Sequence, residues 1–275
     1  MARDNSRASP PVTPSLIVRS FRPLRNPVLS VGLLTMRGGL RFSVATVVLI
    51  RHARSSANAT HVLAGRTPGV GLDDTGRQQA RELAERLRGI PLVAVVSSPL
   101  DRCRATAEPL LADRPGLTLG LDDGLAECDY GDWTGQDLKA LSRTPLWKVV
   151  QAHPSGVTFP GGETMRAMQH RAVDAVRAHD ATVEAAHGAH AVWAAISHAD
   201  VIKSVVADAL GVHLDEFQRI VVDPASVTVV RYTPSRPFVV RVNETGSLAG
   251  LRPPPGRRRR ARSADGDAVV GGTTG

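Results

Sequence analysis

The chain has few cysteines, no long apolar run and no metal or nucleotide motif, and each shortage excludes a class of protein. Cys103 and Cys128 are the two cysteines among 275 residues, too few for a disulfide framework, so we expect a reduced, cytoplasmic setting. No uninterrupted apolar run reaches the roughly 18 residues that a membrane-spanning helix needs. The nine histidines show no metal-ligand spacing, and Gly161-Gly162 lacks the Lys-Ser/Thr partner of a nucleotide-binding loop.

The net charge of +8 comes from the two ends of the chain and not from its middle. Residues 1–43 contain seven arginines and one acid, and residues 244–275 contain six arginines and three acids. Residues 44–243 carry 21 basic and 22 acidic side chains and are nearly neutral. The run Arg257–Arg260 could bind nucleic-acid phosphates, but no aromatic interleaving or binding motif accompanies it. We therefore favour a solvated basic tail over nucleic-acid binding as the interpretation of this run.

Both ends are predicted to be disordered, because Arg, Pro, Ser and Gly dominate them without a sustained period. For residues 1–43 an equally good hypothesis is that translation starts downstream, at Met36 or at Val44. Residues 44–243 are then the globular domain, and 244–275 are a basic tail. With 42% hydrophobic residues, the chain can bury a core.

Residues 44–243 alternate apolar runs with amphipathic stretches, which predicts an α/β domain. The pattern indicates a three-layer sandwich with a mainly parallel central sheet and helices on both faces. Residues 129–162 are less regular and could cap the strand ends, although their aromatic residues could equally be ordinary packing. We predict strands at 44–50, 92–98, 191–197, 226–232 and 238–242, and helices at 74–88, 101–111, 163–187 and 200–210.

Three of these strands are followed by side chains that suit phosphate chemistry. Arg51 and His52 follow the first strand, and Arg102 comes a few residues after the second. His198 follows the third. Ligands of open α/β sheets bind outside the carboxyl ends of the strands. The sequence therefore predicts two arginines and two histidines at one rim, a set that can hold a phosphate and offer it a nucleophile without a metal.

These residues belong to an ordered series of motifs. Together the motifs resemble the histidine phosphatase superfamily, whose fold is phosphoglycerate mutase-like, over about 44–243. Within it the chain most resembles an actinobacterial group of phosphomutases and phosphatases. The series runs Arg51-His52-Ala53-Arg54-Ser55-Ser56-Ala57-Asn58, Gly65-Arg66, Leu72-Asp73-Asp74-Thr75-Gly76, Ser98-Pro99-Leu100-Asp101-Arg102, Glu127, Tyr130-Gly131-Asp132-Trp133, Gly161-Gly162-Glu163 and Ser197-His198.

The resemblance implies a role for each residue at the predicted rim. His52 would be the nucleophile that becomes a phosphohistidine, which divides one hard displacement into two easier ones. Arg51 and Arg102 would clamp the phosphate oxygens, because the guanidinium group is planar and always charged. His198 would be the second histidine of the pocket and would donate to the transferring phosphoryl group.

The resemblance also implies three residues outside the strand ends. Glu127 would protonate the leaving oxygen and later activate water, which requires a raised pKa from burial or a nearby anion. Ser55 and Asn58 would add neutral donors to the phosphate, although both could simply cap the following turn. Neither a metal nor a cofactor is implied, and the expected partner is a small phosphorylated substrate.

Two departures from the superfamily bear on activity. Ala53 and Ala199 stand where the superfamily normally has glycine after each active histidine. An alanine at positive φ would cost about 1 kcal/mol, and its methyl group could crowd the phosphate. A non-catalytic phosphate-binding protein is therefore one alternative function.

Metal-independent hydrolysis of a small phosphomonoester is the leading functional hypothesis. A phosphomutase is the other alternative, but residues 65–70 lack the Gly-Trp-type sequence of true phosphoglycerate mutases. Sugar phosphates, nucleotides and other small metabolites all stay open as substrates. The oligomeric state is also open, with a dimer as one option.

Overall fold

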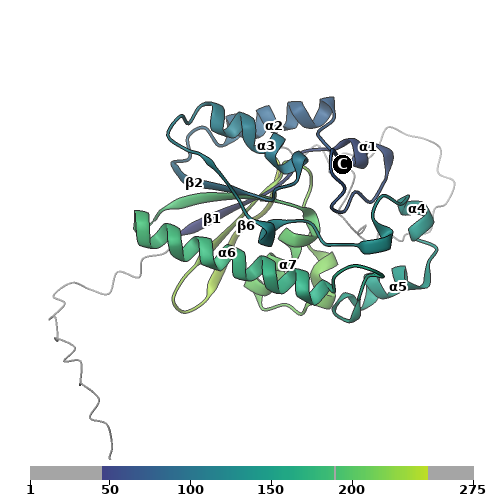
Figure 1. Ribbon diagram of the computed structural model, residues 1–275. Coiled ribbons are helices and arrows are strands. Elements are labelled where there is room, and N and C mark those ends of the chain that lie inside the picture. Colours follow the sequence, from purple (N-terminus) through teal and green to yellow (C-terminus); the bar gives the residue numbers. More distant parts are fainter. Residues whose placement is uncertain (1–44, 189, 247–275) are drawn as a thin grey trace, which may run out of the picture. The chain divides into compact units, whose positions relative to one another are not determined.

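The computed structural model describes residues 45–188 and 190–246 (Figure 1). The predicted extension 1–43 and the tail after residue 246 lie outside the described residues, and the hypotheses about them stay predictions. Within the described part, no helix combines the length and the apolar character needed to cross a membrane.

A six-stranded sheet in the order β3-β2-β4-β1-β5-β6 forms the centre of this unit. β1, β2, β3 and β4 are parallel to their neighbours in that group, whereas β5 runs antiparallel to both β1 and β6. The mainly parallel sheet is thus confirmed, with the three-residue β3 as a strand that the sequence did not predict. The strands are β1 (Thr46–Arg51), β2 (Leu92–Ser97), β3 (Leu119–Leu121), β4 (Val192–Ser197), β5 (Val227–Tyr232) and β6 (Pro237–Glu244).

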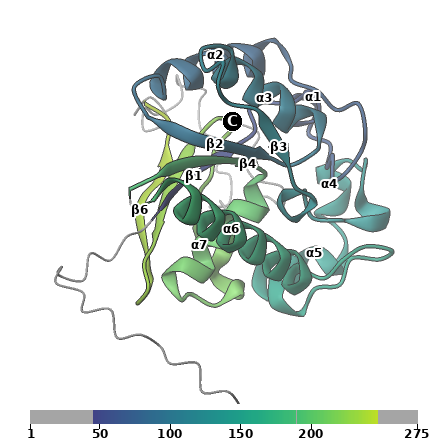
Figure 2. The same ribbon diagram turned by 60° about the vertical axis from the view of Figure 1, so that its left-hand side comes forward.

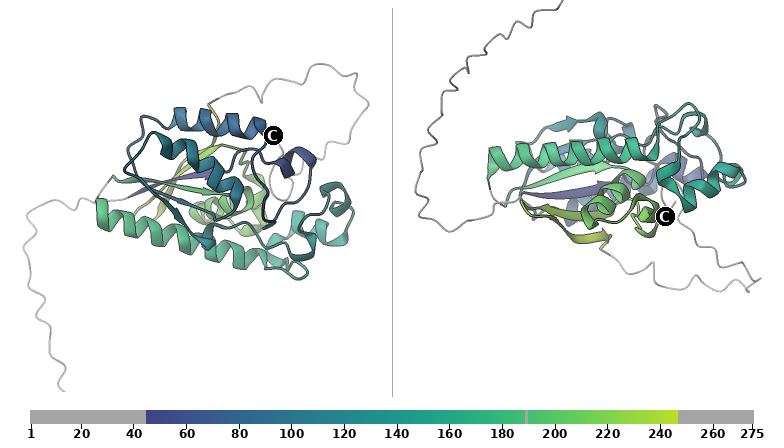
Figure 3. Two further views of the ribbon diagram at one scale, coloured as in Figure 1. Left: turned by 45° about the horizontal axis from the view of Figure 1, so that its top comes forward. Right: turned by 90° about the horizontal axis from the view of Figure 1, so that it is seen from below.

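Helices cover both faces of the sheet, as expected for a three-layer sandwich (Figures 2 and 3). One hydrophobic cluster joins the sheet to α2 and α3, and a second joins it to α6 and α7. The α-helices are α1 (Ser56–Thr60), α2 (Asp74–Arg86), α3 (Asp101–Ala112), α4 (Leu138–Leu141), α5 (Pro145–Ala152), α6 (Met165–His187) and α7 (Ala199–Leu210). Four short 3₁₀ helices cover Asp123–Leu125, Gly131–Trp133, Pro154–Gly156 and Leu214–Arg219.

Pro109 lies inside α3, which nevertheless continues to Ala112. Proline removes one helical hydrogen bond and so weakens the last turn of a helix. The helix persists because Ala107 and Leu110 are buried against the sheet, so tertiary packing outweighs the lost bond. The short helices α1, α4 and α5 were not predicted, since four to eight residues are too few to establish a helical period.

The carboxyl ends of β1, β4 and β2 lie level with one another at one rim of the sheet. Arg51 pairs with Ser197 in the register of β1 and β4. The backbone N–H of His52 donates to the Ser197 carbonyl at 2.9 Å, and that of Ser98 donates to the Ile196 carbonyl at 2.9 Å. The predicted meeting of the three strand ends is therefore confirmed.

Gly76 allows α2 to touch the loop that carries the predicted nucleophile. The Asp73 carboxylate caps this helix by accepting from the Gly76 N–H at 2.7 Å. A Cβ at Gly76 would lie 1.9 Å from the carbonyl oxygen of Arg54, two residues beyond His52. Any larger residue must push the helix and this loop apart.

Replacing Gly76 with alanine should destabilise the domain by about 1–3 kcal/mol, as other overpacking substitutions do. Urea unfolding followed by circular dichroism measures the change. Gly89→Ala is the matched control, because a Cβ there meets nothing within 4 Å, and its effect should stay within about 1 kcal/mol. Equal midpoints for the Gly76→Ala protein and the wild type would contradict this account of the helix–loop contact.

Candidate active site

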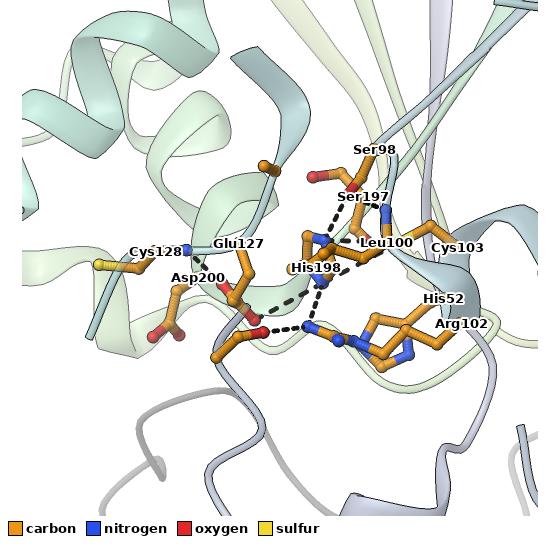
Figure 4. A network of polar contacts seen from close by, with 12 residues as sticks. His52, Ser98, Leu100, Arg102, Cys103, Glu127, Cys128, Ser197, His198 and Asp200 are labelled. Atoms are coloured by element: carbon orange, nitrogen blue, oxygen red, sulfur yellow. Dashed lines mark hydrogen bonds and ion pairs between the residues drawn. The ribbon is translucent and has the colours of Figure 1, made fainter. Parts of the chain in front are cut away.

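The rim brings together the two predicted histidines and Arg102 (Figure 4). Arg102, in the first turn of α3, donates from Nε to His52 Nε2 at 3.3 Å. Its Nη2 lies 3.1 Å from His198 Nδ1. The two imidazole rings meet edge to face with their centroids 5.2 Å apart. One guanidinium group therefore contacts both histidines.

The contacts of His52 fix its tautomer. Its Nδ1 lies 2.8 Å from the backbone carbonyl oxygen of Ala53, which can only accept a hydrogen bond. Nδ1 must then carry the proton, and Nε2 presents a lone pair toward Arg102. Burial, followed by the charges of Arg102 and Arg51, holds the pKa of His52 well below its ordinary value. The ring is therefore neutral, with Nε2 available for attack.

His198 is the N-cap residue of α7 and is fully buried. Because Arg102 donates to Nδ1, the proton of the neutral ring lies on Nε2, which contacts Ser98 Oγ at 2.8 Å. Burial first, and then the charge of Arg102, holds the pKa of His198 well below its ordinary value. Ser98 belongs to the motif series but had no predicted role at the site. Its position directly after β2 was the sequence feature that could have placed it at the rim.

The two arginines give the rim a buried positive charge. Arg51 Nη1 donates to the Val222 carbonyl at 2.7 Å, and burial lowers the pKa of Arg51 to about 10 against the raising effect of Glu127. Arg102 Nη2 donates to the Gly65 carbonyl at 2.8 Å. Among the described residues, nothing accepts a hydrogen bond from the buried Arg102 Nη1. A buried cation with an unused donor fits an anion such as phosphate.

Glu127 lies on the other side of His198 and is buried, with 4% of its surface exposed. Its Oε2 is 3.6 Å from His198 Nδ1, and its Oε1 accepts from the Cys128 N–H at 3.0 Å. Burial and, next, the negative charge of Asp200 raise the pKa of Glu127 to about 7, although Arg102 opposes them. A carboxyl group with this pKa can give and take a proton near neutrality.

The backbone of Glu127 is held by two arginines. Its carbonyl oxygen accepts from Arg66 Nε at 2.8 Å and from Arg171 Nη2 at 3.0 Å. Glu163 pairs with both of these side chains, at 3.1 Å and 2.6 Å, and also accepts from the Asp129 N–H. Glu163 belongs to the motif series and was predicted to have no catalytic role. In the structure it holds the loop that carries Glu127.

Ser55 and Asn58 are bonded to one another. Ser55 is the N-cap of α1, and its Oγ accepts from the Asn58 N–H at 3.2 Å. The Ser55 hydroxyl and backbone N–H donate to Asn58 Oδ1 at 2.9 and 3.0 Å. This reciprocal arrangement is the capping alternative foreseen from the sequence. Phosphate binding by either residue stays a prediction.

Ala53 and Ala199 are fully buried, but neither has a positive φ. Ala53 donates its N–H to Thr106 Oγ1 at 3.0 Å, and Ala199 begins α7. The backbone strain that the two departures from glycine raised as a concern is therefore absent at both positions. The structure therefore gives no reason to expect backbone strain at Ala53 or Ala199 to reduce activity.

The aromatic residues of the 129–162 region pack on one another. The Tyr130 and Trp133 rings lie 5.0 and 5.3 Å from the Phe159 ring, and all three side chains are buried. Trp147 stacks on Trp133 at 6.1 Å. They form part of the core, while α4 and α5 lie at the same end of the sheet as α1 (Figure 1).

A neutral imidazole whose lone pair faces a buried guanidinium group at a strand-end rim is typical of a phosphoryl-transfer site. Comparison with known families agrees. The model of the histidine phosphatase superfamily (branch 1) matches residues 47–245, and the chain belongs to this superfamily. The sequence-based resemblance is thereby confirmed.

Named relatives are found among curated proteins. The chain is 28% identical over 207 residues to phosphoserine phosphatase 1 of Hydrogenobacter thermophilus, covering 74% of this chain and 93% of that protein. It is 30% identical over 213 residues to the bifunctional protein Rv2228c of Mycobacterium tuberculosis, covering 76% of this chain and 57% of that longer protein. Mycobacterial relatives agree with the expected actinobacterial resemblance.

Solved structures share the fold. YhfR of Bacillus stearothermophilus matches with a TM-score of 0.66 and 25% identity, covering 73% of this chain and 97% of that one. The mycobacterial glucosyl-3-phosphoglycerate phosphatase Rv2419c matches with a TM-score of 0.65 and 23% identity, covering 73% and 99%. The predicted phosphoglycerate mutase-like fold is thus confirmed.

Inorganic phosphate should stabilise the protein by filling the site at Arg102. At 100 times its dissociation constant, a ligand adds about 2.7 kcal/mol to the free energy of unfolding, visible as a higher Tm. Arg102→Ala should abolish this shift. Arg104→Ala is the matched control on the same helix, since the exposed Arg104 side chain pairs only loosely with Asp101, and it should keep the full shift. Equal phosphate shifts in all three proteins would place the anion elsewhere.

Proposed function

We propose that this protein hydrolyses a small phosphomonoester without a metal ion. The reaction passes through a phosphohistidine on His52, with Glu127 as the general acid and base. The observation that carries the proposal is the Arg102 guanidinium, which contacts the lone pair of His52 and keeps one buried donor unused. A phosphoryl group held by that donor lies next to the nucleophile.

In the first step, His52 Nε2 attacks the phosphorus atom and the ester P–O bond breaks. The proton of Glu127 passes to the leaving alcohol oxygen, and Nδ1 of His52 keeps its hydrogen bond to the Ala53 carbonyl. Arg51 and Arg102 stabilise the charge on the phosphoryl oxygens. A phosphate dianion favours uptake of a proton from solvent by His198. Arg102 Nη2 then turns from His198 Nδ1 to the phosphoryl oxygens, and the protonated Nδ1 donates to the transferring group until the product phosphate leaves and the proton returns to solvent.

In the second step, water attacks the phosphorus atom of phospho-His52. The ionised Glu127 accepts the proton of this water, the P–N bond breaks, and inorganic phosphate leaves. Glu127 ends the cycle protonated, as it began. Its pKa of about 7 suits both halves of the cycle, because the group must give a proton once and accept one once.

Among the described residues, no cluster of three or more His, Cys, Asp or Glu side chains is arranged to hold a metal ion. The proposal of metal independence rests instead on the two guanidinium groups, which supply the positive charge that phosphoryl transfer requires. A cytoplasmic location belongs to the same proposal, because Cys103 and Cys128 are both buried and unpaired.

A phosphomutase is the second candidate function. A relative named as a probable phosphoglycerate mutase, from Erwinia tasmaniensis, is 33% identical over 128 residues, which cover 46% of this chain and 58% of that protein. A mutase would return the phosphoryl group of His52 to another hydroxyl of the substrate. Products from a phosphoglycerate separate the two functions, since a hydrolase releases inorganic phosphate and a mutase gives the isomeric ester.

The protein should release phosphate from an aryl phosphate in the presence of EDTA. His52→Ala should reduce the rate more than about 10³-fold, as loss of a nucleophile does. His170→Ala, at an exposed histidine of α6, is the matched control and should keep full activity. Acid-quenched protein should carry labelled phosphate only when His52 is present. Chelator-sensitive release, or release that survives His52→Ala, would overturn the proposed chemistry.

Glu127→Gln should separate substrates by their leaving groups. For an alkyl phosphate, whose alcohol needs a proton, the rate should fall about 10²–10⁴-fold. For an aryl phosphate with an acidic phenol, the fall in the phosphorylation rate should be less than about tenfold. In the wild type, kcat/KM for the alkyl ester should decline above about pH 7, where Glu127 loses its proton. Equal losses for both esters would remove Glu127 from the role of acid.

A further inference from the structure

Asp200 is a fully buried carboxyl group at the rim that the proposed mechanism does not use. It lies in the first turn of α7, two residues after His198. The hydroxyl of Tyr130 donates to its Oδ2 at 2.8 Å, and Lys203 Nζ lies 3.7 Å from its Oδ1. The hydroxyl thus holds one carboxyl oxygen in place, and the ammonium group lies near the other.

The Tyr130–Asp200 hydrogen bond joins two pieces of the site. Tyr130 lies three residues after Glu127 on the same loop, whereas Asp200 lies on the helix that begins after His198. Figure 4 shows Asp200 beside Glu127, on the side away from His198. Glu127 therefore lies between a histidine and a second carboxylate.

The charges around Glu127 act in opposite directions. Asp200 raises the pKa of Glu127, second only to burial, and Arg102, the Cys128 N–H and Arg51 lower it. The neutral His198 ring on the other side adds no charge of its own. Without a neighbouring anion, burial alone would oppose the two arginines, which favour the ionised form of Glu127.

Lys203 limits the effect of Asp200 without cancelling it. Its ammonium group is buried, donates to Gln218 Oε1 at 3.0 Å and lies 5.7 Å from the centre of the Phe217 ring. Burial lowers the pKa of Lys203, and Asp200 raises it. The lysine lies near Oδ1 of Asp200, whereas Tyr130 of the loop that carries Glu127 donates to Oδ2.

We propose that Asp200 is a positioning residue that keeps Glu127 protonated by setting the charge of a second buried carboxylate beside it. The inference rests on the proposed function, in which Glu127 is the acid. It adds that the acid is prepared by a residue that never touches the substrate. A purely structural role would instead leave the titration of Glu127 unchanged when the charge of Asp200 is removed.

The direct test is a carbon-13 NMR titration of the glutamate side-chain carboxyls in the full chain, with Glu127→Gln to assign the signal. In the wild type the Glu127 signal should titrate near pH 7. In Asp200→Asn it should titrate lower by about one pH unit, the size expected for loss of one neighbouring charge. Tyr130→Phe removes the hydrogen bond but keeps the charge, and its titration should stay within a few tenths of the wild type.

Two results would overturn the proposal. One is an Asp200→Asn protein that keeps the wild-type amide spectrum and titrates at the wild-type pH, and the other is a Tyr130→Phe protein that shifts as far as Asp200→Asn. Should Asp200→Asn fail to fold, the wild type still decides. Its Asp200 carboxyl signal, assigned through bonds from the backbone amide, must move at the pH at which Glu127 titrates, because the two groups interact. An Asp200 signal that does not respond to that titration contradicts the inference.

The pH dependence of activity provides the second readout. In Asp200→Asn, the decline of kcat/KM for an alkyl phosphate should move down in pH by the same amount as the NMR midpoint. A wild type without His52-dependent activity would defeat the proposed function but would leave the NMR comparison intact. The two failures are therefore distinguishable.

Discussion

The site depends on the burial of one guanidinium group between two imidazole rings. Arg102 cannot be solvated by water in this position, so its donors must find protein acceptors. Nε and Nη2 find them on His52 and His198, and this requirement fixes the tautomer of both rings. The remaining donor, Nη1, is left for a ligand. The buried Arg102 guanidinium thus fixes the tautomer of His52, the proposed nucleophile, and orients His198. Its remaining donor favours an anionic ligand.

The same positive charge sets the conditions under which Glu127 works. Arg102 and Arg51 lower the pKa of Glu127, while burial and Asp200 raise it more. A bound phosphate dianion would offset part of the charge of the arginines and thereby raise this pKa further. In the proposed mechanism, substrate binding and protonation of Glu127 would therefore favour one another. The product phosphate would keep Glu127 protonated in the same way until it leaves.

The sequence predicted the parts of this site that depend on local pattern. Apolar runs mark β1 and β4 because both are buried strands, and the residues that follow them reach one rim. The three-residue β3 carries too little pattern to be recognised. The pairing of Glu163 with Arg171 and the contact of Ser98 with His198 join residues that meet only in the folded chain. No local periodicity predicts such contacts, although the motif resemblance had already singled out Glu163 and Ser98.

The division of the site between sheet and loops bears on how substrates are told apart. The phosphate clamp stands on strand ends and on the first turn of α3, whereas the acid stands on a loop fixed by Arg66, Arg171 and Glu163. That loop leads directly into the region of α4 and α5. Because Trp133 and Phe159 are buried there by mutual packing, they offer a substrate no open ring face. Under the proposed function, we therefore expect the exposed polar side chains of this region to recognise the leaving group, and a change among them to alter substrate choice while the phosphate clamp stays as it is.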